Sequence, residues 1–182
     1  MRPFFKNHFT KPVNCDILLY GKIKMGEVSM TEIIFSTQTS CAEETETLGA
    51  KLADLIRHGN ELPFFVALYG DLGVGKTAFV RGFTALIAPQ ATVRSPTFAL
   101  VNEYRGKPLS IFHFDMYRIA DEDDLISIGF YDYLERSGIC LVEWSENIPY
   151  ALPEQYIRVT IEKDDPTHPD SRKITAERIG EN

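Results

Sequence analysis

A short glycine-rich stretch near the middle of the chain carries the clearest chemical signal. Residues 70–77 read Gly-Asp-Leu-Gly-Val-Gly-Lys-Thr and match the pattern G-x-x-x-x-G-K-[ST]. In such a loop the glycines let successive backbone N–H groups turn inward around phosphate oxygens, and the following helix N-terminus adds partial positive charge. Lys76 would reach the β- and γ-phosphates, and Thr77 would offer its hydroxyl to Mg²⁺. The sequence therefore predicts a site for a nucleoside triphosphate and Mg²⁺.

The flanks of this loop agree with that interpretation. An apolar run over residues 64–69 precedes it, and helical spacing of apolar residues over 76–87 follows it. An ordinary glycine-rich turn is the alternative, but a strand before the motif and a helix after it favour the phosphate loop. The residues that we expect to contact the nucleotide here are Asp71, Leu72, Gly73, Val74, Gly75, Lys76, Thr77 and Ala78.

Two further segments each end an apolar run in a carboxylate. Residues 109–115 end in Asp115, and residues 139–143 end in Glu143. A P-loop NTPase needs an acidic residue for the Mg²⁺ shell and a group that positions the attacking water. Periodicity does not assign these two roles, and either carboxylate could instead be a solvated group at a strand end. Asp115, Glu143 and Lys76 are therefore the candidate catalytic residues.

Strands and helices predicted from the apolar pattern must position these residues. Ser40 followed by Glu43 is a capping-box pattern, so residues 40–58, with leucines at helical spacing, are expected to form an amphipathic helix. The turn at 105–108 predicts an antiparallel hairpin. The predicted elements are that hairpin (97–104 with 109–116), strands 31–36, 64–69, 139–144, 157–161 and 172–179, a helix over 76–87, two short helices broken at Gly129 and Gly138, and a polar loop over 164–171.

The predicted fold class is α/β: a P-loop NTPase fold with a mixed parallel/antiparallel central sheet flanked by helices. The hairpins require antiparallel neighbours, whereas the buried apolar strands suit parallel pairing. Nucleotide should bind beyond the carboxyl ends of the central strands. We assign residues 31–182 to a single P-loop ATPase domain. We interpret residues 1–30 as a flexible N-terminal extension, either a functional tail or sequence upstream of a later start at Met25 or Met30.

Composition narrows the class of protein further. The 182 residues are 44% hydrophobic and 25% charged, as is usual for one globular domain. Because 19 Lys and Arg stand against 26 Asp and Glu, the net charge is −7, and the chain lacks a broad basic surface for nucleic acid. No apolar run approaches the ~18 residues that span a bilayer, so we expect no membrane contact. The 3 cysteines are widely spaced, which argues against disulfides or structural zinc, and we expect a cytoplasmic protein.

Taken together, the motifs resemble the TsaE family of tRNA threonylcarbamoyladenosine biosynthesis proteins. The resemblance covers roughly residues 31–179, and it rests on the order of motifs after the phosphate loop rather than on that loop alone. The segments that carry it are the loop 70–77, Arg81-Gly82-Phe83, Ser95-Pro96-Thr97-Phe98, His113-Phe114-Asp115-Met116-Tyr117-Arg118, Leu141-Val142-Glu143-Trp144 and the Thr45-x-x-Leu48-Gly49 stretch.

The resemblance implies an ATP-binding and hydrolysing accessory protein. Such a protein is needed for N6-threonylcarbamoyladenosine formation at position 37 of tRNAs that decode ANN codons. In this family the TsaD protein, with TsaB, transfers the threonylcarbamoyl group, and TsaE acts on that pair. The resemblance thus implies a Mg²⁺-dependent ATPase that acts with its partners. We expect it to be weak alone and stimulated by them, because no complete constellation for water activation with an arginine finger is visible in the sequence and a finger can come from a partner. The chain would meet tRNA only indirectly, through TsaB and TsaD, which agrees with its acidic balance.

The family's motifs also imply roles for individual residues of this chain. Thr77 and Glu143 would be the Mg²⁺ ligands, and Asp115 would position water beside the γ-phosphate or belong to the metal shell. We interpret His113 as a packed or orienting residue rather than a base, because phosphoryl transfer depends mainly on positioning and charge stabilisation. The further residues expected at the nucleotide are Thr45, Thr97, Trp144 and Arg172.

Two other functions fit the same phosphate motif. A P-loop small-molecule kinase would normally add an arginine-bearing lid, but the arginines of this chain form no cluster in sequence. A non-hydrolytic, nucleotide-gated interaction module would keep Lys76 and Thr77 and bind ATP without releasing phosphate. Assays of phosphate transfer to small acceptors, and of phosphate release with partners present, distinguish these functions from the ATPase.

Overall fold

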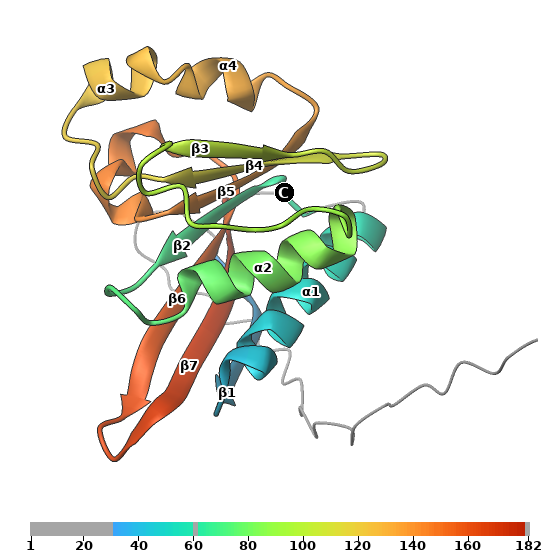
Figure 1. Cartoon of the computed structure of the whole chain (residues 1–182), viewed down its shortest axis with the longest axis vertical. Coiled ribbons are helices and arrows are strands. Elements are labelled where there is room, and N and C mark those ends of the chain that lie inside the picture. Colours follow the sequence, from blue (N-terminus) through green and yellow to red (C-terminus); the bar gives the residue numbers. More distant parts are fainter. Residues whose placement is uncertain (1–30, 60–61, 181–182) are drawn as a thin grey trace, which may run out of the picture.

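The computed structural model describes residues 31–59 and 62–180 (Figure 1). The predicted extension over residues 1–30 lies outside the described residues. Within the described part, 7 strands form one sheet in the order β1-β7-β6-β2-β5-β4-β3. The strands are β1 (Thr31–Thr39), β2 (Phe65–Tyr69), β3 (Val101–Tyr104), β4 (Ser110–Asp115), β5 (Gly138–Glu143), β6 (Tyr156–Asp165) and β7 (His168–Ile179).

The sheet is mixed, as the sequence predicts. The four neighbours β6, β2, β5 and β4 are parallel. β3 pairs antiparallel with β4, and β7 pairs antiparallel with both β6 and β1. The predicted α/β fold with a mixed sheet is therefore confirmed. The carboxyl ends of the parallel strands meet along one edge, which is where ligands bind in open sheets of this class.

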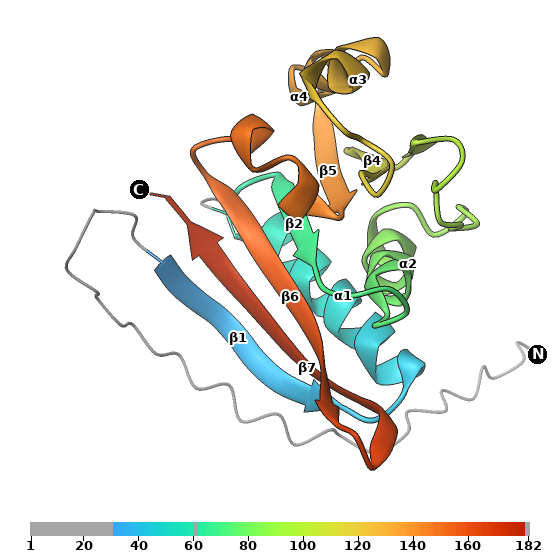
Figure 2. The same ribbon diagram turned by 90° about the vertical axis from the view of Figure 1, so that its left-hand side faces the viewer.

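Helices cover the sheet on both faces (Figures 1 and 2). α1 (Ala42–His58) and α2 (Lys76–Ile87) pack on one face, whereas α3 (Glu122–Ser127) and α4 (Phe130–Leu134) pack on the other, against β4 and β5. Two 3-10 helices, η1 (Ser145–Asn147) and η2 (Pro149–Ala151), follow β5. Among the described residues, no helix combines the length and apolar character needed to cross a membrane.

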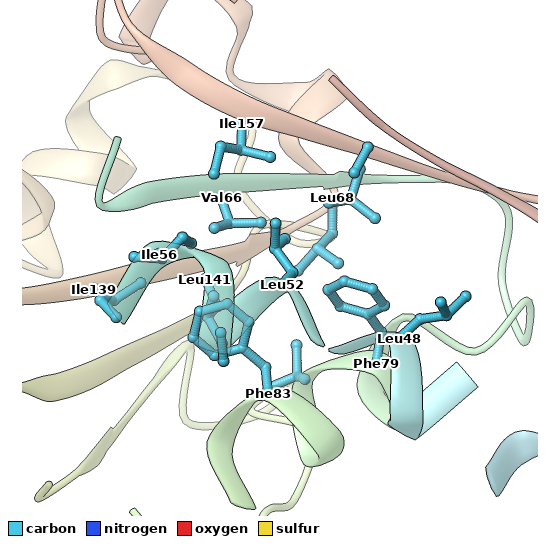
Figure 3. Packing of buried hydrophobic residues seen from close by; sticks show 14 of the residues in the cluster. Leu48, Leu52, Ile56, Val66, Leu68, Phe79, Phe83, Ile139, Leu141 and Ile157 are labelled. Carbon is cyan, nitrogen blue, oxygen red and sulfur yellow. The ribbon is translucent and has the colours of Figure 1, made fainter. Parts of the chain in front are cut away.

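β2 is the middle strand, and its side chains enter two separate cores. Val66 and Leu68 pack toward α1 and α2 (Figure 3). Phe65 points to the opposite face, where its ring meets that of Phe130 from α4 edge-on at 6.4 Å between centroids. A strand with apolar side chains on both faces appears in sequence as a continuous apolar run. That is the pattern of residues 64–69, and it places the phosphate loop at the end of a strand that is buried on both faces.

α1 and α2 approach so closely that their contact requires two glycines. A Cβ on Gly82 would lie 1.8 Å from the carbonyl oxygen of Glu46, and one on Gly49 would lie 2.1 Å from that of Phe79. The opposing atoms are backbone, so no rotamer change can relieve such a contact. Arg81 also forms an ion pair with Glu46 across the same contact. α1 therefore fixes the position of α2 and of the loop that precedes it.

The capping box predicted at the start of α1, Ser40 with Glu43, is wrong in its residues. The N-cap is Cys41, which makes no side-chain capping bond. Ser40 lies one position earlier, where its backbone N–H and its hydroxyl donate to the Glu44 carboxylate at 2.7 and 3.0 Å. The helix starts later than the pattern suggests because Thr39 still belongs to β1, so Ser40 has to form the turn out of the strand.

The polar loop predicted over residues 164–171 is also wrong, because most of it is strand. β6 runs to Asp165 and β7 begins at His168, and these two residues pair with each other. The backbone N–H of Thr167 donates to the Asp165 carboxylate at 2.7 Å, which closes the turn. Side chains at this end of the hairpin are mostly exposed, so no apolar periodicity marks the strands.

The first strand of the other hairpin is shorter than predicted. Residues 97–100 form a turn, in which the N–H of Leu100 bonds to the carbonyl oxygen of Pro96 at 2.6 Å. Leu100 also has a φ of 64°, a left-handed conformation that interrupts an extended chain. β3 therefore begins only at Val101.

Replacing Gly82 with Ala should destabilise the fold, although alanine is the better helix former by about 1 kcal/mol. The added methyl group meets the α1 backbone, and overpacking of this kind lowers the free energy of unfolding by about 1–3 kcal/mol. Urea denaturation measures this change. As a control, Ala85→Ser adds one heavy atom to the exposed side of α2 and should change the free energy by less than about 0.5 kcal/mol. Equal stability of Gly82→Ala and the parent chain would contradict the close helix contact.

Candidate functional site

The loop between β2 and α2 follows a backbone path that its glycines permit. Gly70, Gly73 and Gly75 have φ values of 130°, 75° and 110°. At Gly70 a Cβ would also lie 2.2 Å from the carbonyl oxygen of Ile161 in β6, so only glycine fits there. Gly75 is the N-cap of α2, and the first turn of that helix contains no acidic residue. The partial positive charge of the helix end is therefore available to an anion.

Lys76 is buried at the start of α2, with 5% of its surface exposed. Its ammonium donates to the carbonyl oxygens of Gly70 and Asp71, the latter at 3.0 Å, and lies 3.8 Å from the centre of the Trp144 ring. Burial lowers the pKa of Lys76, and nearby carboxylates, Glu143 foremost, oppose that shift. The ammonium therefore lies within the curve of the loop, where the motif places phosphate.

Glu143 is the last residue of β5, and 3% of it is exposed. Its Oε1 accepts a hydrogen bond from the Thr77 hydroxyl at 2.9 Å and lies 2.9 Å from Nε2 of His113. A hydroxyl and a carboxylate thus lie together at the start of α2. Such oxygen donors suit Mg²⁺, which usually takes one or two carboxylates together with water and substrate phosphates. The two predicted metal ligands are brought together and fit that ion.

Asp115 ends β4 directly beside Glu143, because the two residues are partners in the parallel β4–β5 register. Its exposed fraction is 3%. Oδ2 accepts hydrogen bonds from the hydroxyls of Thr97 at 2.6 Å and Ser95 at 3.2 Å, and Oδ1 accepts one from the backbone N–H of Tyr117 at 3.1 Å. These donors compensate for the burial of the carboxylate. They also attach the segment before β3 to the end of β4.

Trp144 turns back over the site because its backbone is left-handed. Its φ is 60°, a conformation that costs a non-glycine residue on the order of 1–3 kcal/mol and occurs mainly at functional sites. The ring lies beside Lys76 and 5.0 Å, between centroids, from the ring of Tyr117. The ring therefore lies beside the phosphate loop, and its contact with a nucleotide stays a prediction.

These groups open onto one pocket of about 350 Å³. The three candidate catalytic residues and both predicted metal ligands line it. Ser95 and Tyr117 line it as well, and sequence reasoning missed both. Ser95 precedes Thr97 by two residues, and Tyr117 follows Asp115 by two residues. Their closeness in sequence to these two predicted site residues is the signal that could have identified them. The complete lining is Leu72, Gly73, Gly75, Lys76, Thr77, Ser95, Thr97, Asp115, Tyr117, Glu143 and Trp144.

The other predicted nucleotide contacts lie around this lining rather than in it. Asp71, Val74 and Ala78 belong to the loop and the first turn of α2, where the motif uses backbone groups. Thr45 is buried in α1, with its hydroxyl 3.1 Å from that of Thr39. Arg172 in β7 donates from Nε to the carbonyl oxygen of Val74 at 2.8 Å, so it contacts the loop from outside. Direct contact of these five residues with a nucleotide stays a prediction.

Comparison with known proteins assigns the chain to a family. The model of the family described as "Threonylcarbamoyl adenosine biosynthesis protein TsaE" matches residues 39–174. This chain belongs to the TsaE family. The matched range contains the phosphate loop, both buried carboxylates and Arg172, so the TsaE match includes every residue selected for the site.

Individual TsaE proteins are similar to this chain over most of their length. The tRNA threonylcarbamoyladenosine biosynthesis protein TsaE of Haemophilus influenzae is 44% identical over 115 residues, which cover 63% of this chain and 73% of that protein. The protein of the same name from Bacillus subtilis is 35% identical over 138 residues, 76% of this chain and 82% of that protein. The crystal structure of Bacillus subtilis YdiB aligns with a TM-score of 0.65 at 28% identity, covering 85% of this chain and 90% of that one. The predicted family and fold are thus confirmed.

Replacing Lys76 with Ala should weaken the binding of ADP to this TsaE protein. The change removes a charge-assisted contact worth about 1.5–3 kcal/mol. The affinity should fall about tenfold to a hundredfold, because ~1.4 kcal/mol is a factor of ten. Isothermal titration calorimetry with ADP measures the fall, and Lys163→Ala, at an exposed lysine of β6, is the control that should bind normally. Unchanged ADP affinity in folded Lys76→Ala protein would count against the phosphate loop.

Proposed function

We propose that this TsaE protein is a Mg²⁺-dependent ATPase that assists threonylcarbamoyladenosine formation in tRNA by acting on the TsaB–TsaD pair. The observation that carries the ATPase proposal is the hydrogen bond from the Thr77 hydroxyl to Glu143, next to the buried Lys76. It joins the phosphate loop to the end of β5, so that groups suited to phosphate and to metal line one pocket. The names of the relatives, which refer to tRNA threonylcarbamoyladenosine biosynthesis, support the role in tRNA modification.

ATP and Mg²⁺ are the proposed ligands. The backbone N–H groups of residues 70–76 and the positive end of α2 hold the phosphates. Lys76 supplies a cation to the β- and γ-phosphates, and Thr77 and Glu143 hold the Mg²⁺. Mg²⁺ held there would supply positive charge to the phosphate oxygens. The hydrogen bond between Thr77 and Glu143 supports their assignment as the two metal ligands, because it already brings their oxygen atoms together.

Asp115 is the proposed water-positioning residue. An ionised carboxylate has about four acceptor sites, and 3 hydrogen bonds from Thr97, Ser95 and Tyr117 occupy this one. An acceptor site remains for a water molecule, either the attacking one or one in the metal shell. The hydrogen bond from Thr97 to Asp115 connects the segment before β3 to the side of the site where we propose that the γ-phosphate binds.

Action through partners fits the charge of the pocket and of the chain. Of the residues described as lining the pocket, Lys76 is the one cation. A further cation for the transition state can come from a partner protein, as an arginine finger does. The net charge of −7 also fits a protein that meets tRNA through TsaB and TsaD rather than directly.

Hydrolysis of ATP by the isolated chain should be slow, and it should rise when TsaB and TsaD are added. An arginine supplied in trans is worth about 10³–10⁵-fold in GTPases, so a stimulation of at least about tenfold is expected here. Steady-state phosphate release with and without the pair measures it, with serum albumin as the protein control. Turnover of about 1–100 s⁻¹ by the chain alone, the range of kinases, would contradict the accessory role.

Substitutions of the two carboxylates should have different effects. Glu143→Gln should weaken Mg²⁺-dependent ADP binding and hydrolysis together, because an amide is a poor ligand for a hard cation. Asp115→Asn should keep Mg²⁺-dependent ADP binding, while partner-stimulated hydrolysis falls by ~10²-fold, the scale for removing a positioned proton acceptor. Calorimetry with ADP, with and without Mg²⁺, and phosphate release in the reconstituted system measure both effects.

The control for these two variants is Asp123→Asn, at an exposed carboxylate of α3. It should bind ADP and hydrolyse ATP as the parent chain does. If Asp115→Asn abolishes Mg²⁺-dependent ADP binding while Glu143→Gln leaves it intact, the two proposed roles are reversed.

A further inference from the structure

A histidine lies behind Glu143, and its ring is completely buried. His113 in β4 is the register partner of Leu141, which stands two residues before Glu143 in β5. Side chains two residues apart project from the same face of a strand, so the ring and the carboxylate share one face of the sheet. Nε2 of His113 lies 2.9 Å from Oε1 of Glu143.

The carboxylate of Glu143 is held through one of its two oxygens. Oε1 bonds both to the Thr77 hydroxyl and to His113, each at 2.9 Å. No hydrogen bond to Oε2 occurs among the residues that the structure describes. Because the two partners belong to different elements, α2 and β4, they define the rotation of the carboxylate as well as its position. Oε2 is then the oxygen that is presented to a further ligand.

The second ring nitrogen of His113 indicates which way the hydrogen bond runs. Nδ1 is buried and has no hydrogen-bond partner in the described part of the chain. A proton on Nδ1 would therefore be a buried donor without an acceptor, which is costly. With the proton on Nε2, the ring donates to Glu143 and leaves only an unpaired acceptor. The geometry selects the tautomer in which His113 is a hydrogen-bond donor to the carboxylate.

We propose that His113 is a positioning residue that orients Glu143 for Mg²⁺. This inference rests on the proposed function, and it assigns His113 a role through Glu143 rather than direct contact with the nucleotide. Partners of metal ligands fix the orientation of the ligand and raise metal affinity. If His113 only filled space in the core, an apolar side chain would do so without burying a polar ring. The imidazole adds an N–H that points at the carboxylate of Glu143.

Two substitutions at His113 separate hydrogen bonding from packing. Gln places an amide N–H near the position of Nε2, whereas Asn is too short to reach Glu143. The control is His58→Asn, at an exposed histidine near the end of α1. Calorimetric titration of the ADP-bound protein with Mg²⁺ measures the Mg²⁺ concentration at half-saturation. A separate ADP titration in EDTA measures the affinity of the metal-free site.

We expect His113→Asn to raise the Mg²⁺ concentration at half-saturation by about tenfold, the lower end of the effect of such partners on metal affinity. ADP affinity in EDTA should stay unchanged, and His113→Gln should restore most of the Mg²⁺ affinity. If folded His113→Asn protein binds Mg²⁺ as the parent does, or loses ADP affinity equally in EDTA, the proposal is overturned. Failure of the proposed function would give a different result, because the parent chain itself would then show no Mg²⁺-dependent ADP binding. That result would overturn the proposal for His113 as well.

A second measurement uses the unsubstituted protein and does not depend on the folding of any variant. Long-range ¹H–¹⁵N correlation spectra identify which ring nitrogen of His113 carries the proton. We expect a protonated Nε2 and a bare Nδ1. A proton on Nδ1 with a bare Nε2 would overturn the proposal, because His113 would then have no N–H to donate to Glu143.

Discussion

The burial of two neighbouring carboxylates is the constraint on which the site depends. Asp115 and Glu143 end adjacent parallel strands as register partners, and each is 3% exposed. A buried carboxylate is costly unless it is hydrogen-bonded or paired. Hydrogen-bond partners from separate parts of the fold offset this cost. Thr77 from α2 donates to Glu143, and Thr97 from the segment before β3 donates to Asp115. Nε2 of His113 from β4 is a second hydrogen-bond partner of Glu143. The carboxylates thereby join elements that are distant in sequence.

These donors reach the carboxylates only because the start of α2 is held in place from several sides. The glycine contact between Gly82 and Glu46 sets the distance of α2 from α1. The loop before α2 passes so close to β6 that Gly70 admits no side chain, and Arg172 of β7 bonds to the carbonyl oxygen of Val74. β6 and β7 therefore both contact the phosphate loop directly.

Local patterns in the sequence predicted most of the elements and several of the residues that meet at one end of the sheet, but not the contacts between those residues. The spacing over 70–77 and the apolar runs before Asp115 and Glu143 identify one end of the sheet. In open α/β sheets, ligands bind beyond the carboxyl ends of the strands. The hydrogen bond of His113 depends on β4 and β5 being neighbours in one register, and strand order is set by long-range packing. The left-handed backbone of Trp144 likewise has no signal in residue type, since glycine and asparagine are the residues that usually mark that conformation.

The position of Lys76 has a consequence for how tightly the loop can hold any anion. Its ammonium is solvated internally, by two carbonyl oxygens of its own loop and by the face of Trp144. A phosphate that approaches Lys76 competes with these partners, so the free energy of binding is a difference between two sets of contacts. An anion of low charge gains less from this exchange than a highly charged one, because its attraction to the ammonium is weaker. The two carbonyl oxygens and the ring of Trp144 therefore lower the net free energy that any anion gains by binding at Lys76.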